Sequence, residues 1–473
     1  MRSTIVATAL MGLLAGCASV RTEPAPGHPR NIIFFLGDGM GMNTLTAARI
    51  YAVGEDGELT LDTLPESAFV KTFANNAQVT DSAASMSAYM TGHKVNNGVL
   101  SMSTDTAAIA PGADSSGNRT VSRCTGGTAV LTLGELAKRR GMAVGVVTTT
   151  RVTDATPAAV FSHACHRGME TDIAAALVPG GVGYNSALGP SGLDVLLGGG
   201  TKSFLGTADG GIRPDGRNLL AELRAKGVRT VADTGELYAV DAASGAPLVG
   251  LFAPGNLGYD AARNQARDPG LAAMASTAIS VLSKNPNGFF LVVEGGLIDL
   301  ALHDTHAKRA LQEVVSFDNT LKATIDRMRV LDPGLKNTLI VVTADHDHTL
   351  LLNGYSPRTG KTTPDNPGVL GLMRKISDGT LRLDADGAPF TIIGFGTGER
   401  RVQGKRSSAP ALTDADVTAD EYRQEAVVRT APGDETHGGA DVYLGAIGAR
   451  AERFGGTIDN TRVFELIKAA AGW

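Results

Sequence analysis

Short apolar runs that lead into an acidic residue are the feature that most limits how this chain can fold. In chain order they are NIIFFL at 31–36 before Asp38, FFLVV at 289–293 before Glu294, and TLIVVT at 338–343 before Asp345. Continuous apolar runs of this length are typical of strands that are buried on both faces of a parallel sheet. The sequence therefore predicts an α/β fold, a three-layer αβα sandwich around a central, mostly parallel sheet.

Five further elements fit the same alternation of strands and helices. We expect strands at 68–73 and 143–149, and helices at 129–140, 271–282 and 306–328. Residues 355–432 lose this alternation and are rich in Pro, Gly and Asp. We expect them to form an insertion with some hairpin character within a single domain that spans 31–473.

Composition excludes several classes of protein. Apolar residues make up 43% of the chain and charged residues 19%, which is too apolar for a disordered chain. The sequence contains no stretch of 18 or more apolar residues, so a multi-span membrane protein is not expected. A net charge of −5 provides no basic field for nucleic acid, which we do not expect as a specific partner.

The acidic residues that follow the strands should meet at one edge of the sheet. Ligands of open α/β sheets bind beyond the carboxyl ends of the strands. Asp154 follows the run at 143–149, and Asp299 lies five residues after Glu294, so five carboxylates would come together there. Their repulsion would raise several pKa values, and bound cations remove that cost. The joint pattern predicts a metal site, although a single Asp after a strand is more often a helix cap.

Histidines add a second type of ligand to this set. Asp299 and His303 are four positions apart and would face the same way on one helical turn. His346 directly follows Asp345, and His437 lies in a glycine-flanked loop. Mixed histidine and carboxylate ligands suit zinc, whereas all-oxygen sites suit magnesium.

Ser82 is a candidate nucleophile. Asp81 is a suitable N-cap for a helix that begins at Ser82, where backbone N–H groups and the helix dipole favour an anion. A serine at a metal site can ionise by coordination and needs no histidine base. A plain capping motif remains the alternative.

The N-terminus has the pattern of an export signal. Residues 1–16 carry Arg2 and a short apolar core and end before Cys17, which is typical of a bacterial lipoprotein signal. We expect a lipidated Cys17, a tether over 17–30, and a periplasmic or cell-envelope location; an ordinary secretory signal is the alternative. Export permits disulfides, and with Cys17 used by lipid we predict a bond between Cys124 and Cys165.

Several segments together resemble alkaline phosphatase. The matching blocks are NIIFFLGDGMG (31–41), VTDSAASMSAYMTG (79–92), VGVVTTTRVTDATPAA (144–159), VVEGGLIDLALH (292–303), VTADHDH (342–348) and ETHGG (435–439). Their occurrence together and in the order of the family makes the resemblance specific. It implies a phosphomonoesterase of broad specificity that is active at alkaline pH, forms a phosphoserine on Ser82, releases inorganic phosphate, and is usually a homodimer.

The resemblance also implies roles for individual residues. One zinc site would consist of Asp299, His303 and His437. A second would consist of Asp38, Asp345 and His346, with Ser82 beside it. A third site, usually occupied by magnesium, would consist of Asp38, Thr156 and Glu294, with Asp154 in its outer shell. Arg167 would bind phosphate with its planar guanidinium, and His348 would orient Asp299.

One position departs from the family pattern. Relatives carry Lys, His or Trp after the aspartate that corresponds to Asp299, and a Lys or His there can hold phosphate through water or bind in the third metal site. Leu300 can do neither, so product phosphate is expected to be held less tightly. The other histidines match no ligand position and are expected to be surface or core residues: His28, His93, His163, His166 and His306.

Two related activities fit less well. Phosphodiesterases and phosphonate hydrolases of the same superfamily usually carry a threonine nucleophile and no third metal site, whereas this chain has Ser82, Thr156 and Glu294. Arylsulfatases have x-Pro-x-Arg after the nucleophile, which the sequence after Ser82 lacks. A surface lipoprotein that only holds metal would be expected to have lost a site residue.

Overall fold

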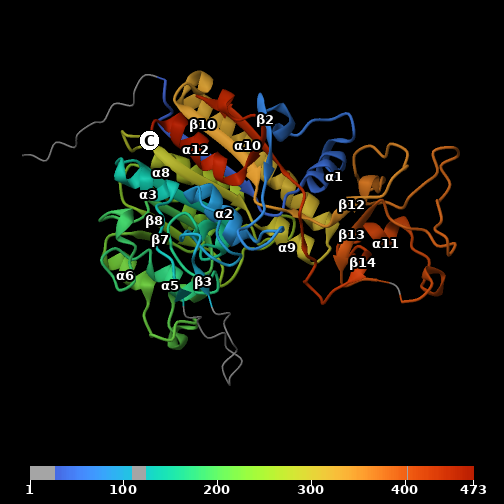
Figure 1. The fold of residues 1–473 in the computed structure, drawn as a ribbon, viewed down its shortest axis with the longest axis horizontal. Coiled ribbons are helices and arrows are strands. Elements are labelled where there is room, and N and C mark those ends of the chain that lie inside the picture. The colour runs from blue at the N-terminus through green and yellow to red at the C-terminus, as the bar shows by residue number, and fades with distance from the viewer. Residues whose placement is uncertain (1–26, 109–123, 402) are drawn as a thin grey trace, which may run out of the picture.

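The computed structural model describes residues 27–108, 124–401 and 403–473, and a ten-stranded sheet runs through its centre (Figure 1). The order across the sheet is β17 (Gly456–Asp459), β2 (Glu66–Lys71), β16 (Val442–Gly448), β10 (Thr338–Ala344), β1 (Asn31–Gly37), β9 (Phe289–Gly295), β5 (Ala143–Arg151), β6 (Val195–Gly199), β8 (Leu248–Leu251) and β7 (Arg229–Val231). Only β16 runs antiparallel to its neighbours, β10 and β2. The predicted mostly parallel sheet is confirmed.

Helices cover both faces of this sheet. Phe34 and Phe35 are consecutive on β1 and therefore point to opposite faces. The ring of Phe34 lies 5.5 Å from that of Tyr89 on α2 (Ser82–Thr91), and the ring of Phe35 lies 5.6 Å from that of Phe317 on α10 (Ala307–Leu331). Burial on both faces explains why β1 reads as a continuous apolar run rather than an alternating one.

Each face has its own group of packed helices. One group packs around α10 and comprises α1 (Met42–Val53), α8 (Leu271–Leu282) and α9 (Leu297–His303). The other packs around α2 and comprises α3 (Leu133–Arg139), α4 (Ala155–Ala158) and α12 (Asn460–Ala471). The remaining helices and short strands are α5 (Glu170–Ala175), α6 (Leu219–Ala225), α7 (Thr234–Tyr238), β3 (Ala107–Ala108), β4 (Cys124–Thr125), β11 (Asp347–His348) and β15 (His437–Gly438).

The register of the central strands places their carboxyl ends level with one another. Gly37 at the end of β1 pairs with Ala344 on β10 and with Gly295 on β9. Because these strands are parallel, the residues that follow them emerge at the same edge. This register brings together the acids that the sequence places after each run.

A small second sheet lies at one end of the molecule (Figure 1). It contains β12 (Leu350–Leu352), β13 (Ile393–Gly398) and β14 (Ala426–Arg429), with α11 (Asp414–Thr418) nearby. The pair β12–β13 is antiparallel and the pair β13–β14 is parallel. The bridges Leu372–Thr391 and Arg374–Leu381 are antiparallel, so the segment 355–432 has the hairpin character expected of it.

The helix expected at 129–140 was predicted to begin too early. Its first residue is Leu133, because Thr132 and Glu135 form a capping box. The Thr132 hydroxyl accepts from the Glu135 N–H at 3.1 Å, and the Glu135 carboxylate accepts from the Thr132 N–H at 2.8 Å. Thr132 has an extended backbone and the helix begins only after it.

The N-terminal segment is largely outside the described residues. The signal expected at 1–16, the lipid site expected at Cys17 and most of the tether expected at 17–30 fall there. Across the part of the chain that the structure describes, every helix is too short or too polar to span a bilayer.

Candidate active site

The acids that follow the strands meet at the carboxyl edge of the sheet, as the sequence predicts. Asp38 follows β1, Asp345 follows β10, and Glu294 lies near the end of β9. Burial raises the pKa of Asp38 well above its usual range, and the neighbouring charges of Asp345, Asp299 and Glu294 raise it further. The repulsion expected from converging carboxylates is therefore present in the folded chain.

A first group gathers around His346. Its Nε2 lies 3.4 Å from Oδ1 of Asp38 and 3.3 Å from Oδ2 of Asp345. The Oγ of Ser82 lies 3.3 Å from the same nitrogen. Ser82 opens α2, and the Asp81 carboxylate caps that helix by accepting from the Ala84 N–H at 2.9 Å. The capping role predicted for Asp81 is confirmed, and it places the Ser82 hydroxyl beside a buried carboxylate–imidazole cluster.

A second group gathers around one oxygen of Asp299. Its Oδ1 lies 3.4 Å from Nε2 of His303, one turn along α9, and 3.6 Å from Nε2 of His437. The two imidazole nitrogens are 3.2 Å apart. His437 reaches this position because β15 pairs with β11, which sets it opposite His348. A pair from one helical turn and a histidine more than a hundred positions further along the chain thus bring their ligand atoms together.

Behind Asp299 stands a buried histidine with a buried carboxylate. Nε2 of His348 lies 2.8 Å from Oδ1 of Asp299, and its Nδ1 bonds to the carboxylate of Glu435. Burial acts to lower the pKa of His348, but these two hydrogen bonds outweigh it and raise the pKa to about 10. Glu435 also accepts from the Thr349 N–H at 2.8 Å. Glu435 is the first residue of the matching block at 435–439, but the sequence pattern indicates no role for it.

A third group surrounds Glu294. Its carboxylate accepts from the hydroxyls of Thr148 and Thr150 on β5, which were not among the predicted site residues. Burial raises the pKa of Glu294 to about 8, and the charges of Asp154 and Asp345 act in the same direction. The Thr156 hydroxyl acts to lower the pKa of Glu294. Its oxygen is buried and has no hydrogen-bond partner among the described residues.

The chemistry of these side chains fits cations. Among the described residues, Oδ1 of Asp38, Oδ2 of Asp345 and Oγ1 of Thr156 are buried without a hydrogen-bond partner. A buried oxygen without a partner is costly, and a divalent cation supplies the missing one. Burial also lowers the pKa of His346 well below its usual range and that of His437 to about 4, so both imidazoles are neutral and can bind metal.

A cleft of about 550 Å³ leads to these groups. Its lining includes Asp38, Asp299, Leu300 and His303, together with Asp154 and Arg167. The Nη2 atom of Arg167 lies 2.8 Å from Oδ1 of Asp154, and its Nη1 lies 3.3 Å from Oδ2 of Asp81. A guanidinium held at the mouth of a site with buried carboxylates is suited to an anionic ligand.

Comparison with known proteins decides the family. The sequence profile described as alkaline phosphatase matches residues 29–473. The tissue-nonspecific alkaline phosphatase of Rattus norvegicus is 36% identical over 93% of this chain and 83% of its own. This chain belongs to the alkaline phosphatase family. It is a metal-dependent phosphomonoesterase. Three clusters of its described side chains are arranged so that they could hold metal ions: Asp299 with His346, His348 and His437; His303 with His348 and Glu435; and Asp38 with Asp345 and His346.

Solved alkaline phosphatases have the same fold. The enzyme from Thermus thermophilus matches with a TM-score of 0.66 and 26% identity, covering 98% of this chain and 96% of its own. A variant of the enzyme from the Antarctic bacterium TAB5, described with Mg bound in its M3 site, matches with a TM-score of 0.63 and 23% identity, covering 95% of this chain and 99% of its own.

The alkaline phosphatase keeps its other histidines out of the three groups. His163 lies 2.7 Å from the buried carboxylate of Glu135, and the rings of His306 and His28 bond to backbone carbonyls. His93 is exposed. His166 lines the cleft beside Arg167, a position that the sequence did not indicate.

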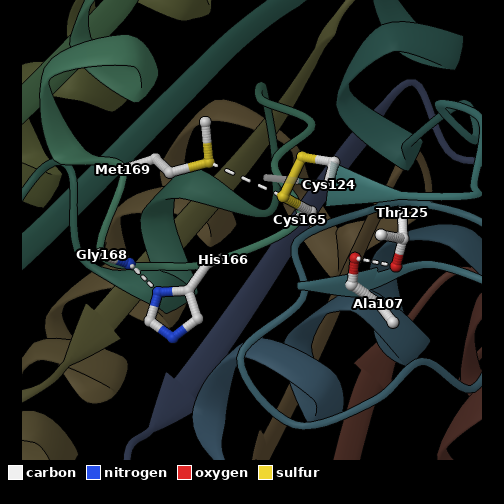
Figure 2. The surroundings of a disulfide bond; sticks show 7 residues. All are labelled: Ala107, Cys124, Thr125, Cys165, His166, Gly168 and Met169. Atoms are coloured by element: carbon white, nitrogen blue, oxygen red, sulfur yellow. Dashed lines mark hydrogen bonds between the residues drawn. A yellow bond between two sulfur atoms is a disulfide. The ribbon is translucent and has the colours of Figure 1, made fainter. Parts of the chain in front are cut away.

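A disulfide holds the segment that carries Arg167. Cys124 and Cys165 are bonded, as predicted, and lie 41 residues apart (Figure 2). Figure 2 shows His166 and Gly168, which flank Arg167 in the chain, close to this bond. The Arg167 N–H donates to the Gly98 carbonyl at 2.7 Å. In this alkaline phosphatase two contacts therefore restrain the segment that carries the cleft arginine, the disulfide at Cys165 and the backbone hydrogen bond from Arg167 to Gly98.

Proposed function

We propose that this enzyme hydrolyses a broad range of phosphate monoesters at alkaline pH through a phosphoserine on Ser82. The observation that carries the proposal is the position of the Ser82 hydroxyl, 3.3 Å from Nε2 of His346. The same nitrogen lies beside Asp38 and Asp345, each of which has one buried oxygen without a hydrogen-bond partner among the described residues. A serine in this setting can be ionised by a bound cation. The cleft presents groups suited to a phosphoryl group, so the alcohol part of the substrate can vary.

We assign the metals from the type of ligand. Asp299, His303 and His437 would hold one zinc ion, and Asp38, Asp345, His346 and Ser82 would hold a second. The third group, Asp38, Thr156 and Glu294 with Asp154 in its outer shell, offers only oxygen and suits magnesium. The magnesium named for the TAB5 relative supports this choice. When bound, such cations lower the pKa of a hydroxyl or a water and neutralise charge on phosphoryl oxygens.

The chain's own residues then carry two in-line displacements. Arg167 would hold two non-bridging oxygens of the phosphoryl group with its planar fork. The Ser82 hydroxyl loses its proton to solvent and its Oγ attacks phosphorus; the bond to the leaving oxygen breaks, and the leaving oxygen takes a proton from solvent. A water that loses a proton to solvent then attacks phosphorus on the side away from Ser82, the bond between phosphorus and Oγ breaks, Oγ regains a proton, and inorganic phosphate is released. Nearby, His348 keeps Asp299 in a fixed orientation through the 2.8 Å contact.

The proposed cellular setting rests on the sequence. Removal of residues 1–16 would leave Cys17 as a lipidated first residue, followed by the tether 17–30 and the single domain 31–473. The enzyme would then be anchored to a membrane of the bacterial envelope and face the periplasm or the exterior. We also propose a homodimer, as in relatives of the family.

Trapping the intermediate tests the central step. Incubation with labelled inorganic phosphate and an acid quench should label one peptide, and mass spectrometry should locate the label on Ser82. Ser82→Ala should lose the label and most of the turnover while retaining metal. Ser283→Ala, at an exposed serine that ends α8, is the matched control and should behave like the parent. Label on another residue, or parental turnover in Ser82→Ala, would overturn the proposal.

A further inference from the structure

A second arginine lies in the cleft beside Arg167. Arg151 ends β5, lines the same cleft, and has a side chain that is 31% exposed. Its Nη2 lies 2.7 Å from Oδ2 of Asp154, and its Nε lies 3.3 Å from Oε1 of Glu170. Its Nη1 donates to the side-chain oxygen of Asn256 at 3.1 Å. These contacts hold the Arg151 guanidinium in one place.

Asp154 is consequently shared between two guanidiniums. Arg167 donates to Oδ1 of Asp154 at 2.8 Å, and Arg151 donates to Oδ2 at 2.7 Å. The carboxylate also accepts from the Ala155 N–H at 2.8 Å, which fixes it at the start of α4. Both oxygens are therefore occupied, and the orientation of Asp154 depends on Arg151 as much as on Arg167.

The charges around Arg167 show why this sharing matters. Arg167 lies between two carboxylates, Asp81 at 3.3 Å and Asp154 at 2.8 Å. A phosphate dianion has to compete with both for the same N–H groups. The negative charge of Asp154 holds Arg167 and repels the incoming dianion. A second cation paired with Asp154 reduces both effects. Leu300, which lines the same cleft, supplies no such cation.

We propose that Arg151 is a positioning residue for phosphate binding. By pairing with Asp154 it sets the direction of that carboxylate and weakens its hold on Arg167, so that the fork of Arg167 is available to two phosphate oxygens. It thereby supplies, from β5, a positive charge that position 300 lacks. The inference rests on the proposed role of Arg167 in binding phosphate.

A purely structural role is the competing explanation. Through Glu170 and Asn256 the Arg151 side chain also ties β5 to α5 and to the loop after β8. If that tie were its whole purpose, substitution would lower thermal stability and leave the affinity for phosphate unchanged. The KM and the inhibition constant for inorganic phosphate separate the two explanations.

The experiment compares Arg151→Gln with three other variants of the metal-loaded enzyme. Arg167→Ala is the reference for loss of the phosphate arginine, Lys322→Gln removes a positive charge from the exposed face of α10, and Arg151→Gln/Leu300→Lys restores a cation in the cleft. Metal content, kcat, KM and inhibition by inorganic phosphate are measured for each. Calorimetric titration with phosphate provides a readout that does not depend on turnover.

Arg151→Gln should raise KM and the phosphate inhibition constant by about tenfold, with kcat within about threefold and metal content unchanged. The added Lys at 300 should recover part of the loss. The inference is overturned if Arg151→Gln matches Lys322→Gln while Arg167→Ala loses phosphate affinity. If Arg167→Ala also keeps parental affinity, the proposed function of Arg167 fails instead.

A further variant tests the same proposal if Arg151→Gln does not fold. Glu170→Gln removes a carboxylate that competes for Arg151 and leaves the pair with Asp154 in place. The proposal expects KM and the inhibition constant of Glu170→Gln to stay at the parental value or fall. A rise to the level of Arg167→Ala would contradict it.

Discussion

His348 and Asp299 are joined by a 2.8 Å hydrogen bond between Nε2 and Oδ1, although 49 positions separate them in the chain. The other ring nitrogen of His348 is held by the buried carboxylate of Glu435. Asp299 is therefore oriented by a chain of two buried partners before any cation binds. Partners of this kind fix the direction of a metal ligand and raise its affinity for the ion.

Removing His348 should weaken the metal site of which Asp299 is part. We expect His348→Ala to lower zinc affinity by about 10- to 100-fold, because Asp299 loses the donor that orients it. Competition with a chelator of known affinity measures this. His93→Ala, at an exposed histidine, is the matched control and should keep the parental affinity. Parental zinc affinity in His348→Ala would show that Asp299 needs no support.

Metal uptake should release protons in a pH-dependent way. Without cations, burial raises the pKa of Glu294 to about 8 and that of Asp345 to about 7. A protonated carboxyl has to lose its proton before it can bind a cation. Apparent metal affinity should therefore rise as pH increases through this range, and fewer protons should be released at pH 9 than at pH 6.5. Titration calorimetry in buffers of different ionisation enthalpy counts these protons, and equal release at both values would refute the prediction.

Glu313 on α10 should make the fold less stable as pH rises. Burial raises its pKa from 4.5 to about 7, and the charge of Asp260 adds to this. Because the folded pKa exceeds the unfolded one, the cost is absent below about pH 4.5, develops as pH rises, and is complete above about pH 7. Glu313→Gln keeps an oxygen for the Asp260 N–H, which now bonds to Oε1 at 2.6 Å.

The unfolding free energy of Glu313→Gln minus that of the parent should therefore increase between pH 5 and pH 8, by up to about 3 kcal/mol. Denaturant titrations at the two pH values measure it. Glu465→Gln, at an exposed glutamate on α12, is the control and should show no such trend. A difference that is the same at both pH values would mean that Glu313 ionises as freely in the folded chain as in the unfolded one.

The disulfide should stabilise both the fold and the cleft. A cross-link between residues 41 positions apart limits the unfolded chain by about 4 kcal/mol in the chain-entropy description. Cys124→Ser/Cys165→Ser should lower the unfolding free energy by up to this amount. Because Arg167 lies two residues after Cys165, KM should rise more than kcat falls. The parent after mild reduction should match the double variant. A parental KM in both would show that the disulfide does not affect substrate binding in the cleft.

The strands and the acids at their ends could be predicted because both depend on local patterns. Parallel strands buried on both faces must be continuously apolar, and β1, β9 and β10 are. Asp81 was recognisable as a helix cap, and Asp299 with His303 as one face of a helical turn. His437 could be recognised only as a histidine in a glycine-flanked loop, and the resemblance assigned it to a site, because its place depends on the pairing of β15 with β11.

Other parts of the site depend on contacts that no local pattern records. Glu435 meets His348 across 87 positions, and Glu294 meets Thr148 across 146. β16 lies between β10 and β2 and runs antiparallel to both, a direction that its own sequence does not indicate. Arg151 lies within the matching block at 144–159 but has no role assigned to it there, and its pairing with Asp154 is visible only once β5 and α4 are placed.

The most direct test of the proposed metal sites is to locate the bound metals by anomalous diffraction at the zinc edge. We expect one zinc among Asp299, His303 and His437, and a second among Asp38, Asp345 and His346 within bonding distance of the Ser82 hydroxyl. We expect no zinc signal at Glu294 and Thr156, where magnesium should bind. Zinc found elsewhere, or zinc at these residues but remote from Ser82, would contradict the proposed mechanism.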